Sequence, residues 1–198
     1  VEAGADLKAR SKGGSTPLLF AARSGNVESV RIMLDAGADP NEAKPDGNSA
    51  LIIAAGSGHG EVGVLLLDRG ADPNGATKDE GLTALHELVL KRPLHSTGWK
   101  RPASHLALAK ALLAHGANPN QQTAKAVTSM GINVTGAIWQ GSTPIILASR
   151  VADLDMLRIL IDPKADARVM TANKTTPVMA AAGVGRAEGN EDPIAETD

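Results

Sequence analysis

Thr16-Pro17-Leu18-Leu19-Phe20-Ala21-Ala22 is the stretch that decides the fold, because related phrases return along the chain. They begin at Ser49, Thr83, Thr143 and Thr176. A second phrase, Gly-Ala-Asp, recurs 33 residues apart, at Gly4, Gly37 and Gly70. A chain with such a period folds as a stack of supersecondary units, each of which buries its apolar face against its neighbours.

The residues of one unit predict a pair of helices. Thr16 suits the cap of a helix that begins at Pro17, where a missing N–H costs nothing. Asn26 suits the cap of a second helix, and Gly37 suits its end because glycine adopts a left-handed backbone freely. The repeats predict antiparallel helix pairs stacked in one layer, with helices over 17–24, 27–36, 50–57, 61–69, 84–91, 105–115, 144–151, 154–162 and 177–183.

Taken together, these phrases resemble the ankyrin-repeat family, and the resemblance covers nearly the whole chain. It implies an all-α solenoid of about five units with β-hairpin fingers between helix pairs. The late phrase Thr175-Thr176-Pro177-Val178-Met179-Ala180-Ala181-Ala182-Gly183 is similar to bacterial ankyrin proteins with loop insertions. That narrower resemblance favours an exported bacterial protein, periplasmic or extracellular, over a cytoplasmic one.

We expect a single ankyrin-repeat domain over 1–198. The phrases place a partial unit at 1–10, units at 11–43, 44–77 and 78–122, a unit at 138–170 and a partial unit at 171–198. One insert lies near 92–104, and a long finger covers 123–137. Neither end reads as a polar capping repeat, which favours a fragment of a longer array. Pro163-Lys164 replaces the Ala-Gly that ends the other second helices, so hydrogen exchange is expected to be fastest after Asp162.

The composition narrows the class of partner. The chain has 198 residues, 42% of them hydrophobic, which is enough for one continuous core. A net charge of −2 gives no reason to expect a nucleic-acid or anionic-membrane surface, and no apolar run approaches the roughly 18 residues that span a bilayer. The absence of cysteine excludes disulfides and thiolate metal sites. A soluble interaction protein fits these limits.

Three chemical motifs in the sequence have structural explanations. Residues 58–63 fit G-x-G-x-x-G but fall between two helices, where no strand-to-helix turn is expected. His86-Glu87 begins like a zinc motif, but Leu90 occupies the second histidine position; the ankyrin resemblance instead implies that His86 hydrogen-bonds Thr83. No ligand spacing supports a metal at His95, His105 and His115. We therefore expect no catalysis, metal or cofactor.

The predicted function is a non-enzymatic protein–protein interaction module that binds its partner on a concave surface made of fingers and first helices. The ankyrin resemblance places partner contacts at Lys12, Arg23, Pro45, Asp46, Asn48, Ser57, Asp79, Glu80, Lys91, Trp99, Trp139, Gln140, Ser142, Arg150 and Asn173.

Two points stay open in the sequence. Trp139 is either the apolar anchor for the partner or packs with Trp99 as a local mini-core. The alternative functions are a small-molecule binder or weak hydrolytic enzyme with a pocket between the inserts, and a structural spacer.

Overall fold

The computed structural model describes residues 6–90, 101–125, 140–161 and 165–182. These ranges contain α1 (Pro17–Ser24), α2 (Val27–Asp35), α3 (Ala50–Ser57), α4 (Gly60–Asp68), α5 (Ala84–Leu90), α6 (Ala103–Ala114), α7 (Pro144–Arg150), α8 (Leu154–Ile161) and α9 (Pro177–Ala181). The described part of the chain holds no β-strand. Its only β pairings are isolated antiparallel bridges, Ala43 with Ser49 and Ala76 with Thr83.

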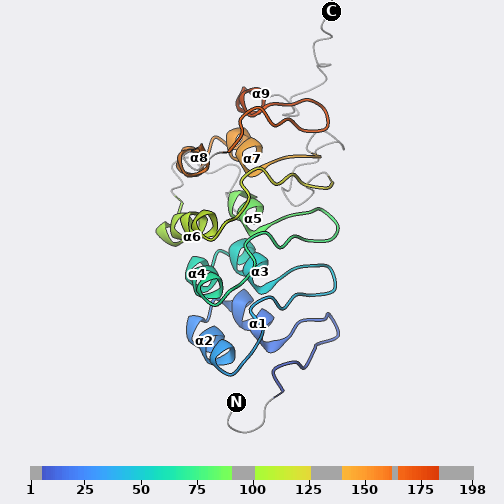
Figure 1. Ribbon diagram of the computed structural model, residues 1–198, viewed down its shortest axis with the longest axis vertical. Coiled ribbons are helices and arrows are strands. Elements are labelled where there is room, and N and C mark those ends of the chain that lie inside the picture. The colour runs from blue at the N-terminus through green and yellow to red at the C-terminus, as the bar shows by residue number, and fades with distance from the viewer. Residues whose placement is uncertain (1–5, 91–100, 126–139, 162–164, 183–198) are drawn as a thin grey trace, which may run out of the picture.

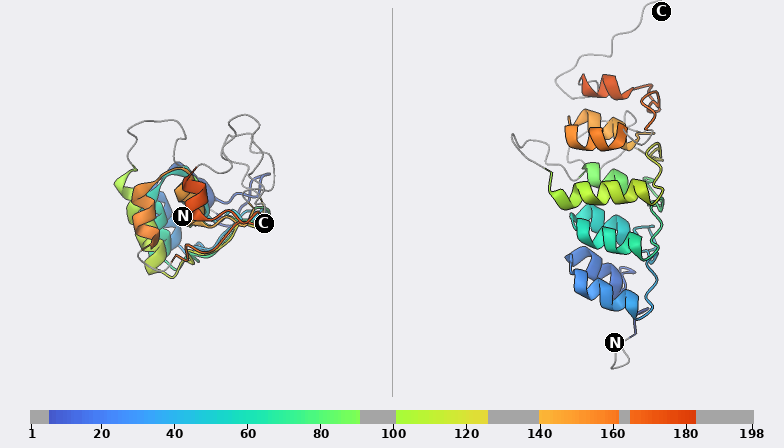
Figure 2. Two further views of the ribbon diagram at one scale, coloured as in Figure 1. Left: turned by 90° about the horizontal axis from the view of Figure 1, so that it is seen from above. Right: turned by 60° about the vertical axis from the view of Figure 1, so that its left-hand side comes forward.

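The helices form two parallel rows. In Figure 1, α1, α3, α5, α7 and α9 are stacked in one row, and α2, α4, α6 and α8 are stacked beside it. Long loops connect one pair to the next and project together from the other side of the first row. Seen along the stack, the pairs and loops superimpose on one another (Figure 2). This arrangement confirms the predicted all-α repeat fold.

Hydroxyl side chains cap the N-termini of α1, α3, α7 and α9, as predicted. The Oγ1 of Thr16 accepts a hydrogen bond from the amide of Leu19 at 3.4 Å, and the Oγ of Ser49 accepts one from Ile52 at 3.3 Å. Thr143 and Thr176 cap α7 and α9 in the same way. Each cap satisfies an amide that has no partner inside its helix.

The turn within a helix pair depends on glycine. Gly25 ends α1 with φ of 75°, and Gly58 ends α3 with φ of 86°. A Cβ atom on Gly25 would lie 2.3 Å from Nδ1 of His59, so the ring of the next pair also requires glycine here. The G-x-G-x-x-G stretch therefore lies at a joint between helices, as expected.

Two helices begin earlier than their sequence suggested. The predicted helix over 105–115 is α6, which begins at Ala103 because the carbonyl of Pro102 accepts hydrogen bonds from His105 and Leu106. Ala103 and Ser104 are thus helical, although the sequence placed them in the insert. Gly60, rather than Glu61, begins α4.

Gly63 has a packing role that its sequence did not reveal. On sequence alone, a glycine inside α4 is only a cost of about 1 kcal/mol relative to alanine. In the structure, a Cβ on Gly63 would lie 2.5 Å from a methyl group of Leu108, which is fully buried on α6. The glycine therefore allows α4 and α6 to approach closely.

Asparagine side chains connect consecutive loops. Nδ2 of Asn41 donates to the carbonyl of Gly70 at 3.2 Å, and its Oδ1 accepts from the amide of Asp72 at 2.7 Å. Nδ2 of Asn74 donates to Gly116 at 3.0 Å, and its Oδ1 accepts from Asn118 at 2.7 Å.

The third member, Asn120, accepts from the amide of Asp166 at 2.7 Å. We call these three residues, Asn41, Asn74 and Asn120, the asparagine ladder. Because each member bonds main-chain groups of the following loop, the ladder fixes the loops relative to one another.

In the second half of the chain, the strained backbone positions among the described residues differ from the position predicted from sequence. The predicted weak point, Pro163-Lys164, lies outside the described residues. Ala152 has a φ of 50° at the turn between α7 and α8, the position held by Gly25 in the first pair. Lys174 has a φ of 58° in the loop before α9. A left-handed backbone costs a residue with a Cβ about 1–2 kcal/mol.

Candidate functional site

The first helices present one continuous exposed face. Leu18, Leu19, Ala21 and Ala22 of α1 are buried, whereas Phe20, Arg23 and Ser24 are exposed. These three positions have the spacing of one helix face. The equivalent residues are Ile53, Gly56 and Ser57 on α3, and Glu87 and Leu90 on α5, all partly exposed. We call these eight residues the first-helix face.

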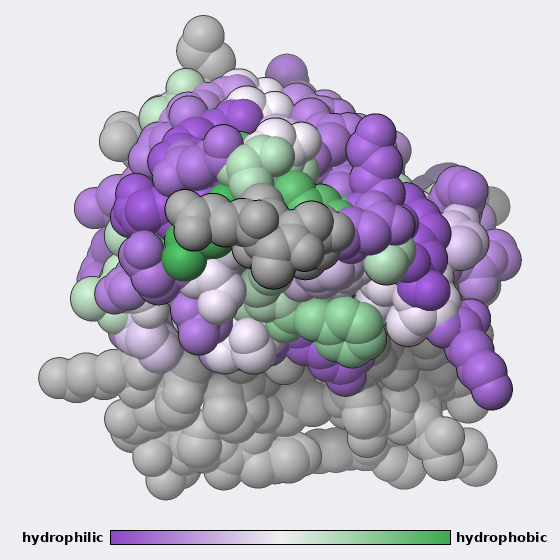
Figure 3. Space-filling view, turned by 90° about the horizontal axis from the view of Figure 1, so that it is seen from below, coloured by the Kyte–Doolittle hydropathy of each residue, from purple (hydrophilic) through white to green (hydrophobic). Residues whose placement is uncertain are grey.

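Phe20 is the most prominent apolar residue of this face, with 54% of its surface exposed. α1 and α2 close the N-terminal end of the stack, and from that end apolar residues lie among polar ones (Figure 3). α2 contributes its own exposed apolar residue, Ile32, which is 48% exposed. The sequence could have indicated Phe20, since it is the only phenylalanine and lies off the buried stripe of α1.

In the middle of the first-helix face, α3 and α5 lie in close contact. A Cβ on Gly56 would lie 2.8 Å from Oε2 of Glu87, so the carboxylate of α5 lies against the backbone of α3. Ser57, a predicted contact, is partly exposed beside it. An apolar residue, a small residue and a carboxylate therefore follow one another along the stack.

The first-helix face does not continue on α7, where the predicted contact Arg150 is buried. Arg150 is only 4% exposed, and Leu147 on the same side of α7 is fully buried. Arg23 occupies the equivalent position on α1 and is exposed. The equivalent positions of α1 and α7 thus differ in exposure, which the local sequence does not show.

Ser142 is a second correction, because it is fully buried. Its carbonyl accepts from the amide of Thr123 at 3.0 Å, and its own amide donates to Thr123 Oγ1 at 3.1 Å. Nε2 of His86 lies 3.3 Å from the same carbonyl. Ser142 thus joins two loop segments to α5 instead of facing a partner.

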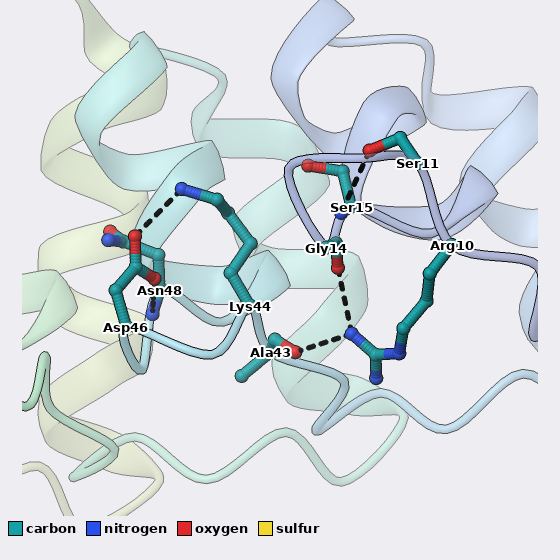
Figure 4. A network of polar contacts seen from close by, with 8 residues as sticks. All are labelled: Arg10, Ser11, Gly14, Ser15, Ala43, Lys44, Asp46 and Asn48. Atoms are coloured by element: carbon teal, nitrogen blue, oxygen red, sulfur yellow. Dashed lines mark hydrogen bonds and ion pairs between the residues drawn. The ribbon is translucent and has the colours of Figure 1, made fainter.

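Polar contacts fix the loop between α2 and α3 (Figure 4). Asp46 accepts from Lys44 Nζ at 2.7 Å and from the amide of Asn48 at 3.0 Å. Desolvation of Asp46 acts to raise its pKa, but the hydrogen bonds from Lys44 and Asn48 outweigh it and lower the pKa from 3.8 to about 2. The carboxylate is therefore ionised throughout the neutral range.

Neighbouring loops are also bonded to each other. Arg10 donates to the carbonyls of Gly14 at 2.8 Å and Ala43 at 3.0 Å, which links the first two loops (Figure 4). Farther along the stack, three loop amides donate to carbonyls of the preceding segment: Lys78 to Asp46, Ala124 to Glu80, and Ala172 to Gln140, at 2.8–2.9 Å. The loop edges therefore form a connected surface.

Most of the other predicted contacts lie at this surface. The exposed ones are Lys12, Arg23, Pro45, Asp46, Asp79, Gln140 and Asn173. Asn48, Ser57 and Glu80 are partly exposed. Lys91, Trp99 and Trp139 lie outside the described residues, as do residues 92–100 of the insert and 126–137 of the long finger that suggested a pocket.

His86 has the structural role that the resemblance implied. Its Nδ1 lies 2.9 Å from Oγ1 of Thr83, and its Nε2 faces the carbonyl of Ser142. Burial lowers the pKa of His86 from 6.5 to about 4, although backbone hydrogen bonds with Ser142 and Gln121 act to raise it. At neutral pH the ring is uncharged and joins α5 to the loop before α7.

The sequence did not indicate the buried ion pair between Arg101 and Asp153. Nε of Arg101 donates to Asp153 Oδ2 at 3.0 Å, and its NH1 donates to the carbonyl of Leu88 at 2.5 Å. Asp153 also caps α8 by accepting from the amide of Met156. Arg101 lies in the basic insert predicted from sequence, where nothing indicated that it would be buried.

The described residues hold no group of three histidine, aspartate or glutamate side chains placed to bind a metal. His95 lies outside them. None of the helices described is long and apolar enough to cross a membrane.

Comparison with known families supports the repeat architecture. Residues 1–77 match the family model of ankyrin repeats, in three copies. The ankyrin match includes α1 to α4 and ends in the loop before α5. None of the curated proteins matches the chain. Ankyrin repeats generally mediate protein–protein interaction, so the matched part fits a non-enzymatic binding protein.

Proposed function

We propose that this protein is an ankyrin-type interaction module that binds a protein partner across the first-helix face and the adjoining loop edges. The proposal extends the ankyrin architecture beyond residue 77, since α5 with α6 and α7 with α8 repeat the pairing of α1 with α2. It includes about five units and treats the long loops as finger-like hairpins.

Phe20 is the observation that carries this proposal. An aromatic ring that stays half exposed in the free protein has about 100 Å² to bury, worth about 2–3 kcal/mol on association. Arg23 lies on the same side of α1 and offers a guanidinium close to this apolar surface. Aromatic and arginine residues are enriched among the residues that dominate interface energies.

The loop edges add polar specificity without a large entropic cost. Asp46 and Asp79 are exposed carboxylates, and each is held by a lysine, Lys44 and Lys125 respectively. Because the loops are already bonded to one another, little freedom remains to be lost when a partner binds. We therefore expect a partner surface of mixed charge with an apolar residue opposite Phe20.

A pair of matched variants tests this function. Binders are selected from a library of displayed protein fragments with the wild-type chain, and their Kd values are compared for wild type, Phe20→Ala and Ile32→Ala. Both changes remove a half-exposed apolar side chain, but only Phe20 belongs to the first-helix face. We expect Phe20→Ala to weaken binding by at least about tenfold and Ile32→Ala to leave it unchanged.

The opposite pattern, with binding lost in Ile32→Ala and kept in Phe20→Ala, would place the partner on the second row of helices. Circular dichroism of both variants shows whether the fold is intact.

A further inference from the structure

The asparagine ladder contains one chemically distinct member. Asn41, Asn74 and Asn120 occupy equivalent positions, and each Oδ1 accepts an amide hydrogen bond at 2.7 Å. The residues that follow them are Glu42, Gly75 and Gln121. Asn74-Gly75 is the only Asn-Gly pair in the sequence.

We propose that Asn74 is a site of spontaneous deamidation, independent of the binding function. The main-chain nitrogen of Gly75 loses its proton to hydroxide and attacks Cγ of Asn74. The new C–N bond closes a five-membered succinimide, the Cγ–Nδ2 bond breaks, and ammonia leaves. Water then opens either carbonyl of the ring and leaves an aspartyl or isoaspartyl residue at position 74.

The backbone at Gly75 favours this attack. Glycine has no Cβ to hinder the folding of its nitrogen back onto the preceding side chain. The amide of Gly75 donates only a long hydrogen bond, 3.4 Å, to the carbonyl of Asp72. Asn74 is exposed, so water and hydroxide reach it.

The ladder contact activates the group under attack. The amide of Asn118 donates to Oδ1 of Asn74 at 2.7 Å, which polarises the side-chain carbonyl and stabilises the oxyanion of the tetrahedral intermediate. Asn41 and Asn120 have the same contact. Asn41 is exposed like Asn74 and differs from it mainly in the following residue, whereas Asn120 is also partly buried. The structure thus supplies two internal controls.

The reaction would weaken one joint of the stack. Nδ2 of Asn74 donates to the carbonyl of Gly116 at 3.0 Å. The product carboxylate has no hydrogen to donate and places a negative charge beside that carbonyl oxygen. The connection between the loop of Asn74 and the turn at Gly116 is therefore lost, while the other ladder contacts stay.

The intact chain is incubated at mildly alkaline pH in ¹⁸O-labelled water, and each asparagine is assayed by peptide mass spectrometry. We expect label at position 74 to accumulate at least about tenfold faster than at 41 or 120, which corresponds to about 1.4 kcal/mol of barrier. Equal rates at the three positions would overturn the proposal.

Two variants test whether the following residue decides the rate. Gly75→Gln reproduces the sequence at Asn120, and a Cβ there fits because its nearest neighbours are atoms of Asp72 at 3.6 and 3.8 Å. It should remove the difference between the three asparagines, and Gln121→Gly should make Asn120 reactive. If Asn74 stays fast in Gly75→Gln, the proposal is wrong.

Asn74→Asp then tests the consequence for the joint. Hydrogen exchange of residues 116 and 117 should become several-fold faster, while the amide of Asn118 keeps its bond to residue 74 and exchange of residues 70–72, at the Asn41 contact, stays at the wild-type rate. Unchanged exchange at residues 116 and 117 would overturn the structural part of the proposal.

Discussion

The helix pairs α1/α2 and α7/α8 have the same layout but are held together by different local chemistry. Glycine forms the turn of the first pair, at Gly25, whereas Ala152 adopts the same left-handed conformation in the second. Asn26 caps α2 as a neutral amide, but the charged Asp153 caps α8 and is buried with Arg101. One architecture is therefore reached through relaxed contacts at one end and strained or charged contacts at the other.

Among the variants that test this difference between the two pairs, removal of the buried ion pair should have the largest effect on stability. The Arg101 and Asp153 side chains are 1% and 5% exposed, so Arg101→Met leaves a buried carboxylate without its cation. We expect this variant to lose about 3–5 kcal/mol of unfolding free energy in urea titrations.

Arg69→Met is the matched control, because Arg69 pairs with Asp35 where the two side chains are 32% and 58% exposed. It should cost less than about 1 kcal/mol. Equal losses in the two variants would show that burial does not distinguish the two pairs.

The second test uses pH and concerns the junction between the two regions. The folded pKa of His86 is about 4, against 6.5 in its ordinary state, so the unfolded chain takes up a proton first on acidification. The stabilisation that the neutral His86 ring gives to the folded state is complete above pH 6.5. It is lost as pH falls to 4, and the free energy of unfolding decreases over this range by a total of about 3 kcal/mol.

His86→Leu should remove most of this pH dependence, since Leu19 and Ile52 occupy the equivalent positions and Ser142 keeps its bond from Thr123. Unfolding free energies measured across this pH range check the prediction. A variant with the full wild-type slope would assign the acid sensitivity to other groups.

The smallest expected effect comes from exchanging the turn residues. Ala152→Gly relieves a left-handed backbone and should stabilise the protein by about 1 kcal/mol. Gly25→Ala should destabilise it by more than this, because its Cβ would also meet the ring of His59. Thermal unfolding of both variants checks the signs, and a destabilising Ala152→Gly would mean that Ala152 is not strained.

The helices could be predicted from sequence because their signals are local. Thr16-Pro17 and Gly25 mark both ends of a helix without reference to the rest of the chain. The role of Gly63 could not be found this way, since it depends on Leu108 from another pair. The asparagine ladder was partly visible as the recurring Asp-x-Asn, but the partners of Asn41 and Asn74 lie in the next loop.

The candidate surface was predicted less well than the fold. Arg23 and Asp46 are exposed as expected, whereas the equivalence of Arg150 with Arg23 failed because exposure depends on what covers each helix. Phe20 was not among the predicted contacts, and the predicted anchor, Trp139, lies outside the described residues. Export and bacterial origin stay predictions.

The asparagine ladder also explains how such a chain tolerates added sequence. Its contacts join residues that are 31, 44 and 46 positions apart, yet the bond to Oδ1 is 2.7 Å each time. Lengthening a closed segment from 31 to 46 residues costs only about 0.4 kcal/mol in chain entropy. A gene encoding this architecture can therefore gain short insertions within or between units at little thermodynamic cost, and each insertion can provide residues for a new binding specificity.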